Sequence, residues 1–516
     1  MDNESRRLVD RPLVVAVIDL GAYTARLEVV QVLPDGTQEI LENLAHPLPL
    51  GNDVFATGRI SGGNIRLTER ILADFSRLMR EYQVEHYKAV ATSAVREALN
   101  RDIFLHRIRE DNGIDIASLE GPEEARLIML SVKDVLAGRY SLAKGNALVY
   151  TIGTGSSQLC FLRDGRMQNA DTIRLGTLRL VHDLGEQLTP SRLREVVDPF
   201  FAAILNSAAR MSTIARPQHL VAVGAPVRAL ISITRKRMPK YKATLTQKRF
   251  EKAHREIAGA SVAELATRYD LQDVVAQSLE PCCHMVECLF QTTDTDRMVI
   301  PMVNTRDALV ADLLREIVGK PDPFIPEIIS SAECLGERYS YDAEHARSVA
   351  DLAIRLYDEL ADLHRLPERC RLLLEVTALI HEIGLFVSNR MHHKHSYYLI
   401  RNSELPGISN EEQVLMATVA RYHRRAMPRT SHYEYMSQPQ DRRVMISKMA
   451  ALLRVADALD RAHQAKVRDL RVETRDDRVL VYVKGPYDLT LEQLGMTRKA
   501  DMFREVFGAE VVLVGQ

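Results

Sequence analysis

Two short glycine-containing segments carry the residue types that phosphate binding requires. Asp19 and Gly21 interrupt a run of β-branched residues, and Thr151 and Gly153 stand in the same relation 132 positions later. A glycine turn lets phosphate oxygens approach backbone N–H groups closely, because no Cβ lies in the way. A carboxylate beside such a turn can hold a divalent cation directly or through water. The segments therefore predict a phosphate site whose second copy lacks the carboxylate.

A candidate general base lies between these two segments. In SLEGPEEARL, Pro122 suits the first position of a helix, which places Glu123 and Glu124 in its first turn. A glutamate near a bound phosphate can align and deprotonate an attacking water. Acidic residues are also favoured at helix N-termini for electrostatic reasons alone, so both interpretations remain open here.

The elements that must position these residues follow one repeated plan. Residues 14–18 predict a short buried strand, and after the glycine turn a second strand resumes near Leu27 and ends at the turn Pro34-Asp35-Gly36. Leu159 and the turn Arg163-Asp164-Gly165 take the corresponding places in the second copy. The agreement extends over about 15 residues, longer than one strand. It predicts two duplicated lobes with a cleft between them.

Helix and strand patterns alternate between the two copies. Residues 67–82 predict an amphipathic helix, residues 87–92 a strand, and residues 93–100 the opening of a second helix. This alternation is typical of an α/β fold. We expect the first lobe to span residues 1–130 and the second to span residues 131–320.

The pattern changes after the Pro-rich segment PDPFIPEI, which begins at Pro321. Long helical patterns such as that over residues 345–363 predict an all-α domain spanning 321–465. Strand alternation around the turn Asp476-Asp477 then predicts a small α+β domain spanning 466–516.

Composition excludes several classes of protein. Hydrophobic residues make up 46% and charged residues 27% of the chain, as in ordinary globular proteins. The formal net charge is −1, so any polyanion site must be local. The chain begins without a secretory signal, and no apolar run approaches the ~20 residues that span a bilayer. Six cysteines without a CxxC motif fit a reducing compartment. We expect a cytoplasmic protein with no membrane partner.

Several motifs occur together in one order along the chain: Asp19-Leu-Gly, ATSAVREALN, EGPEEARL, IGTGSSQL, RLGTLRL, ALIHEIGLFVS, HHKHSYYLIRNSELPGIS and VARYHRR. This ordered set resembles the long form of the exopolyphosphatase/guanosine pentaphosphate phosphatase (Ppx/GppA) family. The resemblance implies a duplicated actin/sugar-kinase/Hsp70-like (ribonuclease H-like) two-lobed α/β fold, followed by an all-α domain related to HD phosphohydrolases. It also implies removal of terminal phosphate from inorganic polyphosphate or from pppGpp with Mg²⁺, and a homodimer built through the helical domains.

The resemblance assigns roles to particular residues. Glu123 matches the catalytic glutamate and, with Asp19, is a candidate Mg²⁺ ligand. The phosphate-binding positions are Gly21, Thr24, Arg96, Gly153, Thr154, Gly155, Ser156 and Gly224. Thr151 and Gln158 stand where the family usually has acidic residues.

These two departures affect metal binding more than anion binding. Gln158 can form hydrogen bonds but cannot supply ligand charge or take up a proton, and a threonine hydroxyl is a poorer Mg²⁺ ligand than a carboxylate. The first hypothesis is therefore a phosphoanhydride hydrolase with a divergent, impaired metal site. The alternative is a catalytically silent regulatory protein that binds polyphosphate or guanosine tetra- or pentaphosphate.

The helical domain contains part of a metal-binding pattern. An HD phosphohydrolase needs a His, a His-Asp pair and a later Asp around metal. His345, His381 and Asp457 occur in that order, but Glu382 replaces the Asp of the pair. The same His-Glu pair resembles long exopolyphosphatases, whose helical domain is not regarded as the catalytic centre. We therefore expect these histidines to be hydrogen-bonded core residues, and the alternative is an active metal centre that makes this domain a hydrolase.

Other histidines and two basic clusters offer further interpretations. His392, His393 and His395 can bind a metal or serve no specific role. The nine cations between residues 235 and 255, and a second cluster at 421–425, predict solvated faces or contacts to a long polyanion. The sequence has no helix-turn-helix, zinc-finger or aromatic RNA-binding signature, so we expect no specific nucleic-acid partner.

Overall fold

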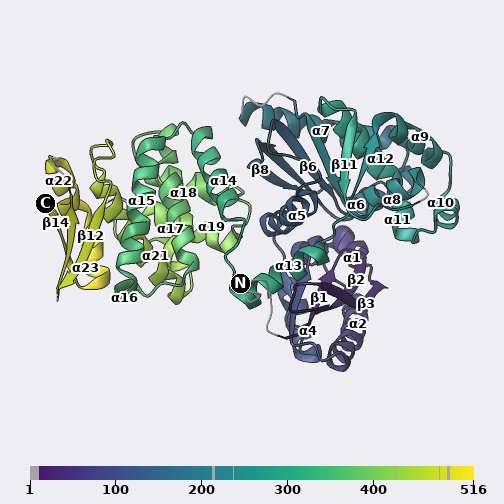
Figure 1. Ribbon diagram of the computed structural model, residues 1–516, viewed down its shortest axis with the longest axis horizontal. Coiled ribbons are helices and arrows are strands. Elements are labelled where there is room, and N and C mark those ends of the chain that lie inside the picture. Colours follow the sequence, from purple (N-terminus) through teal and green to yellow (C-terminus); the bar gives the residue numbers. More distant parts are fainter. Residues whose placement is uncertain are drawn as a thin grey trace, which may run out of the picture. The chain divides into compact units, whose positions relative to one another are not determined.

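The computed structural model describes residues 11–211, 216–235, 237–424, 426–475, 477–484 and 488–515. The chain divides into two compact units, Met1–Phe324 and Ile325–Gln516 (Figure 1). The boundary falls within the segment predicted as a Pro-rich linker. Three residues of the predicted turn and basic clusters, namely Lys236, Arg425 and Asp476, lie outside the described residues.

Lobe I of the first unit is built on a five-stranded sheet. Its strands are β1 (Leu13–Leu20), β2 (Thr24–Val32), β3 (Gln38–Pro47), β4 (His86–Ala91) and β5 (Ala117–Ser118), in the order β3-β2-β1-β4-β5. Strand β1 pairs antiparallel with β2 and parallel with β4.

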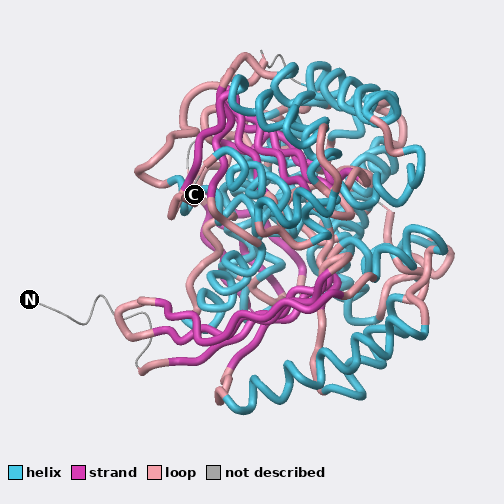
Figure 2. The backbone as a smooth tube through the Cα atoms, turned by 90° about the vertical axis from the view of Figure 1, so that its right-hand side faces the viewer, coloured by secondary structure: helices cyan, strands magenta, loops and turns pink. Residues whose placement is uncertain are grey.

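Both faces of β1 are buried, which explains its continuous apolar run. Ala16, Ile18 and Leu20 pack into one hydrophobic cluster, and the alternate residues Val15 and Val17 pack into another. Figure 2 shows helices on either side of the strands of this sheet.

Lobe II repeats this sheet with one added strand. Its strands are β6 (Asn146–Ile152), β7 (Ser157–Arg163), β8 (Arg166–Ile173), β9 (His219–Val223), β10 (Lys242–Thr246) and β11 (Arg297–Pro301). The order β8-β7-β6-β9-β11 reproduces that of lobe I, and β10 joins the edge antiparallel to β11. The predicted duplication is confirmed by this topology.

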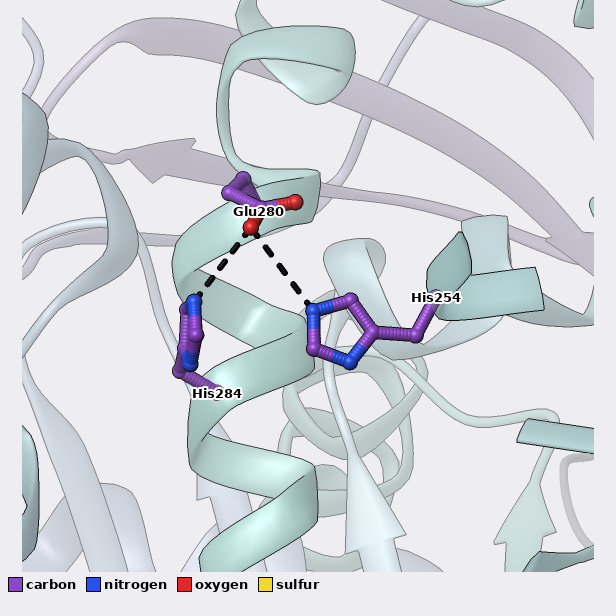
Figure 3. A group of neighbouring side chains, drawn as sticks. All are labelled: His254, Glu280 and His284. Atoms are coloured by element: carbon purple, nitrogen blue, oxygen red, sulfur yellow. Dashed lines mark ion pairs between the residues drawn. The ribbon is translucent and has the colours of Figure 1, made fainter. Parts of the chain in front are cut away.

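The helices of the first unit flank both sheets. They are α1 (Leu50–Thr57), α2 (Gly62–Glu81), α3 (Ser93–Glu97), α4 (Arg101–Asn112), α5 (Gly121–Leu136), α6 (Thr177–Leu184), α7 (Pro190–Met211), α8 (Ala225–Thr234), α9 (Gln247–Ala258), α10 (Val262–Tyr269), α11 (Asp273–Gln277), α12 (Leu279–Thr292) and α13 (Thr305–Val318). The predicted helix over 67–82 begins earlier, because the Ser61 side chain accepts a hydrogen bond from the Asn64 amide and caps α2. Helices α9 and α12 contact each other in lobe II, and Figure 3 shows part of both at close range.

The chain returns to lobe I through α13. This helix lies in the range expected to form lobe II, yet its residues Leu309 and Leu313 pack with Leu13, Val15 and Val17 of β1. The duplicated lobes are therefore not two consecutive blocks of sequence, since α13 closes the second face of the first sheet.

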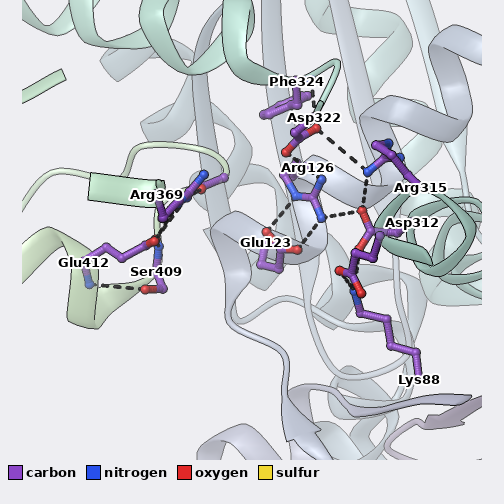
Figure 4. A network of polar contacts seen from close by, with 12 residues as sticks. Lys88, Glu123, Arg126, Asp312, Arg315, Asp322, Phe324, Arg369, Ser409 and Glu412 are labelled. Carbon is purple, nitrogen blue, oxygen red and sulfur yellow. Dashed lines mark hydrogen bonds and ion pairs between the residues drawn. The ribbon is translucent and has the colours of Figure 1, made fainter. Parts of the chain in front are cut away.

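A buried ionic network ties α13 to α5 and β4 (Figure 4). Arg126 is 6% exposed and donates to both carboxylate oxygens of Glu123 at 2.8 and 2.7 Å. It also donates to Asp312 at 2.9 Å and to Asp322 at 3.0 Å. Lys88 reaches the other oxygen of Asp312 at 2.5 Å. Although burial alone would raise the pKa of Asp312, the charges of Arg126 and Lys88 hold it at about 2.

The second unit contains helices followed by a small sheet. Its helices are α14 (Ile325–Arg338), α15 (Ala343–Glu359), α16 (Ala361–His364), α17 (Arg369–Ile380), α18 (His392–Arg401), α19 (Asn410–Arg421), α20 (Tyr433–Met436), α21 (Gln440–Leu459), α22 (Thr490–Lys499) and α23 (Asp501–Phe507). Strand β13 (Arg478–Val483) pairs antiparallel with β12 (Leu470–Arg475) and parallel with β14 (Glu510–Gly515). Helices α22 and α23 pack on α21, so the predicted α+β region shares one compact unit with the helices.

Among the helices of the described ranges, none is both long and apolar enough to cross a membrane.

Replacing Asp312 by Asn should lower the free energy of unfolding by about 2 kcal/mol at pH 7, because the folded-state pKa lies well below the ordinary 3.8. A carboxylate whose pKa is lowered on folding stabilises the protein above its unfolded pKa, and that contribution is lost as pH falls through the folded pKa. The difference between wild type and Asp312→Asn should therefore shrink between about pH 4 and pH 2. Denaturant titrations followed by circular dichroism measure it.

The matched control is Asp74→Asn, which removes an exposed ion pair to Arg77 at 3.2 Å. Such a pair contributes about 0–1 kcal/mol. Equal losses in the two variants, or a loss that does not change with pH, would contradict the role given to Asp312.

Candidate functional site

The two glycine segments face one cleft between the lobes. It lies at the carboxyl ends of β1, β6 and β9, the position where ligands bind in open α/β sheets. Gly21 and Thr24 line it from lobe I, and residues 151–156 and Gly224 line it from lobe II. Gly21 and Gly153 thus share one hollow, as the duplication predicts.

Each segment forms the same turn. The Gly21 amide donates to the Thr24 carbonyl at 2.9 Å, and the Gly153 amide donates to the Ser156 carbonyl at 3.1 Å. The amides between them, of Ala22, Tyr23, Thr154 and Gly155, donate to no backbone carbonyl within the described part of the chain. Such amides in a turn can donate to phosphate oxygens.

The lobe II turn is packed more tightly than its copy. A Cβ at Gly153 would lie 2.3 Å from the Ser156 carbonyl oxygen, whereas one at Gly21 would lie 3.3 Å from the Thr24 carbonyl oxygen. Gly224 has a φ of +134°, and its Cβ would lie 2.2 Å from the Ile152 carbonyl oxygen. Glycine is thus required at Gly153 and Gly224 by sterics alone.

Three arginines that sequence reasoning did not single out also line the cleft: Arg26, Arg228 and Arg306. Arg26 lies directly across the β1–β2 hairpin from Asp19, with 3.7 Å between guanidinium and carboxylate. The seven-residue spacing from Asp19 to Arg26 equals that from Thr151 to Gln158, so hairpin register was the available signal.

The cleft carries more positive than negative side chains. Besides the three arginines, its lining contains the carboxylates of Asp19 and Glu124. Asp19 is 7% exposed, and burial raises its pKa, although Arg26 and Arg306 oppose that rise. An excess of guanidinium groups in a partly desolvated cleft favours a polyanionic ligand.

Glu124, not Glu123, faces this cleft. Consecutive residues of a helix point about 100° apart, and of these two only Glu124 belongs to the lining of the cleft. Glu123 is turned to Arg126, where both its oxygens accept hydrogen bonds, while Glu124 lines the cleft. The geometry therefore moves the candidate base, and the candidate second carboxylate for a metal, from Glu123 to Glu124.

Arg96 does not line the cleft itself, but it contacts two residues that do. Its guanidinium donates to the Glu124 carboxylate at 3.2 Å and to the Ser156 hydroxyl at 3.3 Å. It also donates to the Leu119 carbonyl at 2.7 Å. Arg96 thus links the start of α5 to the second glycine turn.

The two non-acidic positions lie in different surroundings. Thr151 lines the cleft, whereas its cross-strand partner Gln158 is 2% exposed and does not. Neither polar atom of the Gln158 amide has a hydrogen-bond partner among the described residues. Leaving a buried polar group unpaired costs about 1–3 kcal/mol.

The cleft residues fit a Mg²⁺ ion. Asp19 and Glu124 supply carboxylates, Thr151 supplies a hydroxyl, and all three belong to one lining. Mg²⁺ is usually held by one or two carboxylates together with substrate phosphates and water, so this set is sufficient in kind. Thr151 adds no negative charge to this set.

In the second unit, the four predicted HD-like residues converge. Ligand atoms of His345, His381 and Asp457 lie within 4.8 Å of one another, and Glu382 forms similar groups with neighbouring histidines, His423 and His463. The Nδ1 atoms of His345 and His381 are engaged by Asp460 and by the Ala378 carbonyl. Their Nε2 atoms are buried and have no hydrogen-bond partner in the described ranges. Both histidines are therefore hydrogen-bonded core residues, as expected, and each keeps a second nitrogen without a hydrogen bond.

The other histidines and basic clusters that the sequence singled out supply no described residue to the cleft. None of the three predicted histidines, His392, His393 and His395, joins a metal-competent group of the described residues, although His392 contacts His423 at 3.1 Å between Nε2 atoms. A pocket beside the cluster is lined by four cations: Arg424, Arg461, Arg498 and Lys499. Lys499 also pairs with Asp457. The basic stretch 235–255 supplies no described residue to the interlobe cleft.

Comparison with known proteins gave consistent matches. The model of the Ppx/GppA phosphatase family matches residues 29–315, and that of Ppx/GppA phosphatase, domain III, matches residues 329–494. The guanosine-5'-triphosphate,3'-diphosphate pyrophosphatase of Vibrio vulnificus (strain YJ016) is 23% identical over 485 residues, covering 92% of each chain. That of Aliivibrio fischeri (strain MJ11) is 24% identical, covering 82% of this chain and 83% of the relative.

A solved structure agrees with the fold. The exopolyphosphatase from Cytophaga hutchinsonii superposes with a TM-score of 0.50 and 19% identity, covering 59% of this chain and 98% of that one. At this identity the likeness is one of fold, and it supports the two-lobed actin-like architecture.

The two symmetric glycines should respond differently to substitution. Gly153→Ala should destabilise the protein strongly, by more than about 2 kcal/mol, because its Cβ would lie 2.3 Å from a carbonyl oxygen. Gly21→Ala should cost under about 1 kcal/mol, since its nearest contact is 3.3 Å. Thermal unfolding of both variants compares them, and equal shifts in Tm would contradict the tighter packing of the second turn.

Proposed function

The chain belongs to the Ppx/GppA phosphatase family, and on that premise we propose that it is a phosphoanhydride hydrolase acting on inorganic polyphosphate or on pppGpp. The observation that carries the proposal is the interlobe cleft, where two glycine turns, three arginines and Glu124 line one hollow. Phosphoryl transfer depends mainly on positioning and on charge stabilisation, and these groups provide both.

Binding of the phosphate chain rests on the turns and the arginines. The amides of Ala22, Tyr23, Thr154 and Gly155 donate to phosphate oxygens, and Arg26, Arg228 and Arg306 neutralise their charge. Because these contacts are made to phosphate groups alone, they serve a polyphosphate or the 5′-phosphates of a nucleotide equally.

Glu124 acts on the attacking water. Its carboxylate lines the cleft and accepts a hydrogen bond from Arg96, which fixes its orientation. A positioned carboxylate can accept the proton that water loses as it attacks the terminal phosphorus. Arg96 is a positioning residue in this scheme, since it acts through Glu124 and Ser156.

Asp19 and Glu124 would hold Mg²⁺, with the Thr151 hydroxyl as a weaker third group. Mg²⁺ when bound would neutralise charge on the terminal phosphates. Because Thr151 supplies no negative charge, we propose that the metal is held weakly and that turnover is reduced for this reason.

Glu124→Gln should abolish phosphate release, lowering kcat by at least about 100-fold, because the amide cannot accept the proton. Glu123→Gln is the matched control, and it should leave kcat within a few-fold because Glu123 faces Arg126 and not the cleft. Phosphate release from polyphosphate and from pppGpp with Mg²⁺ measures both.

A larger loss of kcat in Glu123→Gln than in Glu124→Gln would assign the catalytic role to Glu123. Release from neither substrate in wild type, with tight binding by calorimetry in EDTA, would overturn hydrolysis. It would instead support the alternative, a regulatory protein that binds these ligands without turnover.

A second candidate activity is favoured by the helical unit. The unpaired Nε2 atoms of His345 and His381 lie next to Asp457 and Glu382, which together offer mixed nitrogen and oxygen ligands for a divalent metal. The adjacent pocket carries four cations suited to a phosphate ester. We propose metal-assisted phosphoester hydrolysis there, although Lys499 occupies one oxygen of Asp457.

With Mn²⁺, the full chain should hydrolyse bis(p-nitrophenyl) phosphate, and His381→Ala should lose this activity while keeping polyphosphate hydrolysis. Glu124→Gln should show the reverse, so each variant controls for folding of the other. Absence of phosphodiester hydrolysis in wild type, or its survival in His381→Ala, would exclude the helical cluster as an active site.

A further inference from the structure

Three side chains on lobe II converge at a place separate from the cleft (Figure 3). His254 extends from α9, and Glu280 and His284 extend from one face of α12, four residues apart. The two helices are packed through Phe250 and Phe290, whose ring centroids lie 5.7 Å apart. None of the three converging side chains belongs to the described lining of the cleft.

Their spacing suits a tetrahedral metal ion. The Glu280 carboxylate oxygen lies 3.3 Å from Nε2 of His284 and 3.7 Å from Nε2 of His254. Two ligands on a tetrahedral Zn²⁺ lie about 3.3 Å apart, because each is bound at roughly 2.0–2.1 Å. All three ligand atoms lie within 4.8 Å of one another. Small side-chain rotations would therefore bring all three within bonding distance of one ion.

The polar atoms of Glu280 and His284 are buried and form no hydrogen bond within the described residues. His284 is 2% exposed, and neither of its ring nitrogens has a hydrogen-bond partner among the described residues. The same holds for both carboxylate oxygens of Glu280. Buried polar atoms are nearly always hydrogen-bonded in folded proteins, so these atoms, which meet only in ion pairs of 3.3 and 3.7 Å, indicate that a shared ligand is missing.

The outer surroundings also match a metal site. Nδ1 of His284 faces the Glu287 carboxylate at 3.8 Å, and an outer carboxylate commonly orients a metal-bound histidine. The side chains of His254 and Glu280 are 17% and 23% exposed, so the group lies close to the protein surface although the carboxylate oxygens of Glu280 are buried.

We propose that His254, Glu280 and His284 bind one Zn²⁺ ion, which cross-links α9 and α12. Two imidazoles and one carboxylate favour zinc over Mg²⁺, which prefers oxygen ligands alone. The helix α12 begins directly after Ser278, a residue of the cleft lining, so the ion stabilises a wall of the cleft without entering it.

Zinc stoichiometry of the full chain tests the proposal. After treatment with EDTA and its removal, wild type is titrated with Zn²⁺ and the bound metal is measured by atomic emission. His254→Ala and Glu280→Gln, both at partly exposed positions, should each bind one equivalent less than wild type. The exposed His106→Ala should bind the wild-type number.

Two further measurements make the outcome decisive. Zn²⁺ should raise the Tm of His381→Ala, which retains the lobe II site, and this rise should disappear when His254→Ala is added. Co²⁺ should give the visible bands of a tetrahedral ion in the same pattern. Equal stoichiometry in wild type, His254→Ala and Glu280→Gln would overturn the site and leave a histidine–glutamate ion pair, whatever the phosphatase assays show.

Discussion

The buried Arg126 guanidinium is the interaction on which the first unit depends. Its hydrogen bonds to Asp312 and Asp322 hold α13, and the chain that follows it, against α5. Its hydrogen bonds to Glu123 occupy both oxygens of that carboxylate. The next residue, Glu124, points about 100° away around the helix and lines the cleft. One buried cation therefore joins α13 and the chain after it to the helix that carries the candidate base.

The duplicated hairpins have kept their backbone and changed their charge. In lobe I the hairpin opposes Asp19 to Arg26, and in lobe II it opposes Thr151 to Gln158 at the same register. The turn hydrogen bonds are the same in both. The cleft therefore has the same turn geometry in both hairpins, but only the lobe I hairpin contributes a carboxylate to it.

The candidate ligand sets of the protein differ in chemistry and in place. The cleft offers carboxylate and hydroxyl oxygens, which suit Mg²⁺. The group on α9 and α12 and the group in the helical unit offer imidazoles with carboxylates, which suit zinc and similar ions. Such a separation lets metals with different ligand preferences occupy different sites of one chain.

The amino-acid sequence alone determined the strands, the glycine turns and their duplication, because a buried strand and a turn depend on residues that are neighbours in the chain. It also placed His345, His381 and Asp457 in the order of a metal pattern. It could not decide between Glu123 and Glu124, since that choice depends on partners of Arg126 that lie 186 and 196 residues away. Only the tertiary structure brought Arg26, Arg228 and Arg306 into one cleft, and His254 next to Glu280 and His284. The physical reason is that charge pairing and metal ligation act between groups that are close in space. Such groups can be separated by any number of residues, so no spacing pattern in the sequence reveals them.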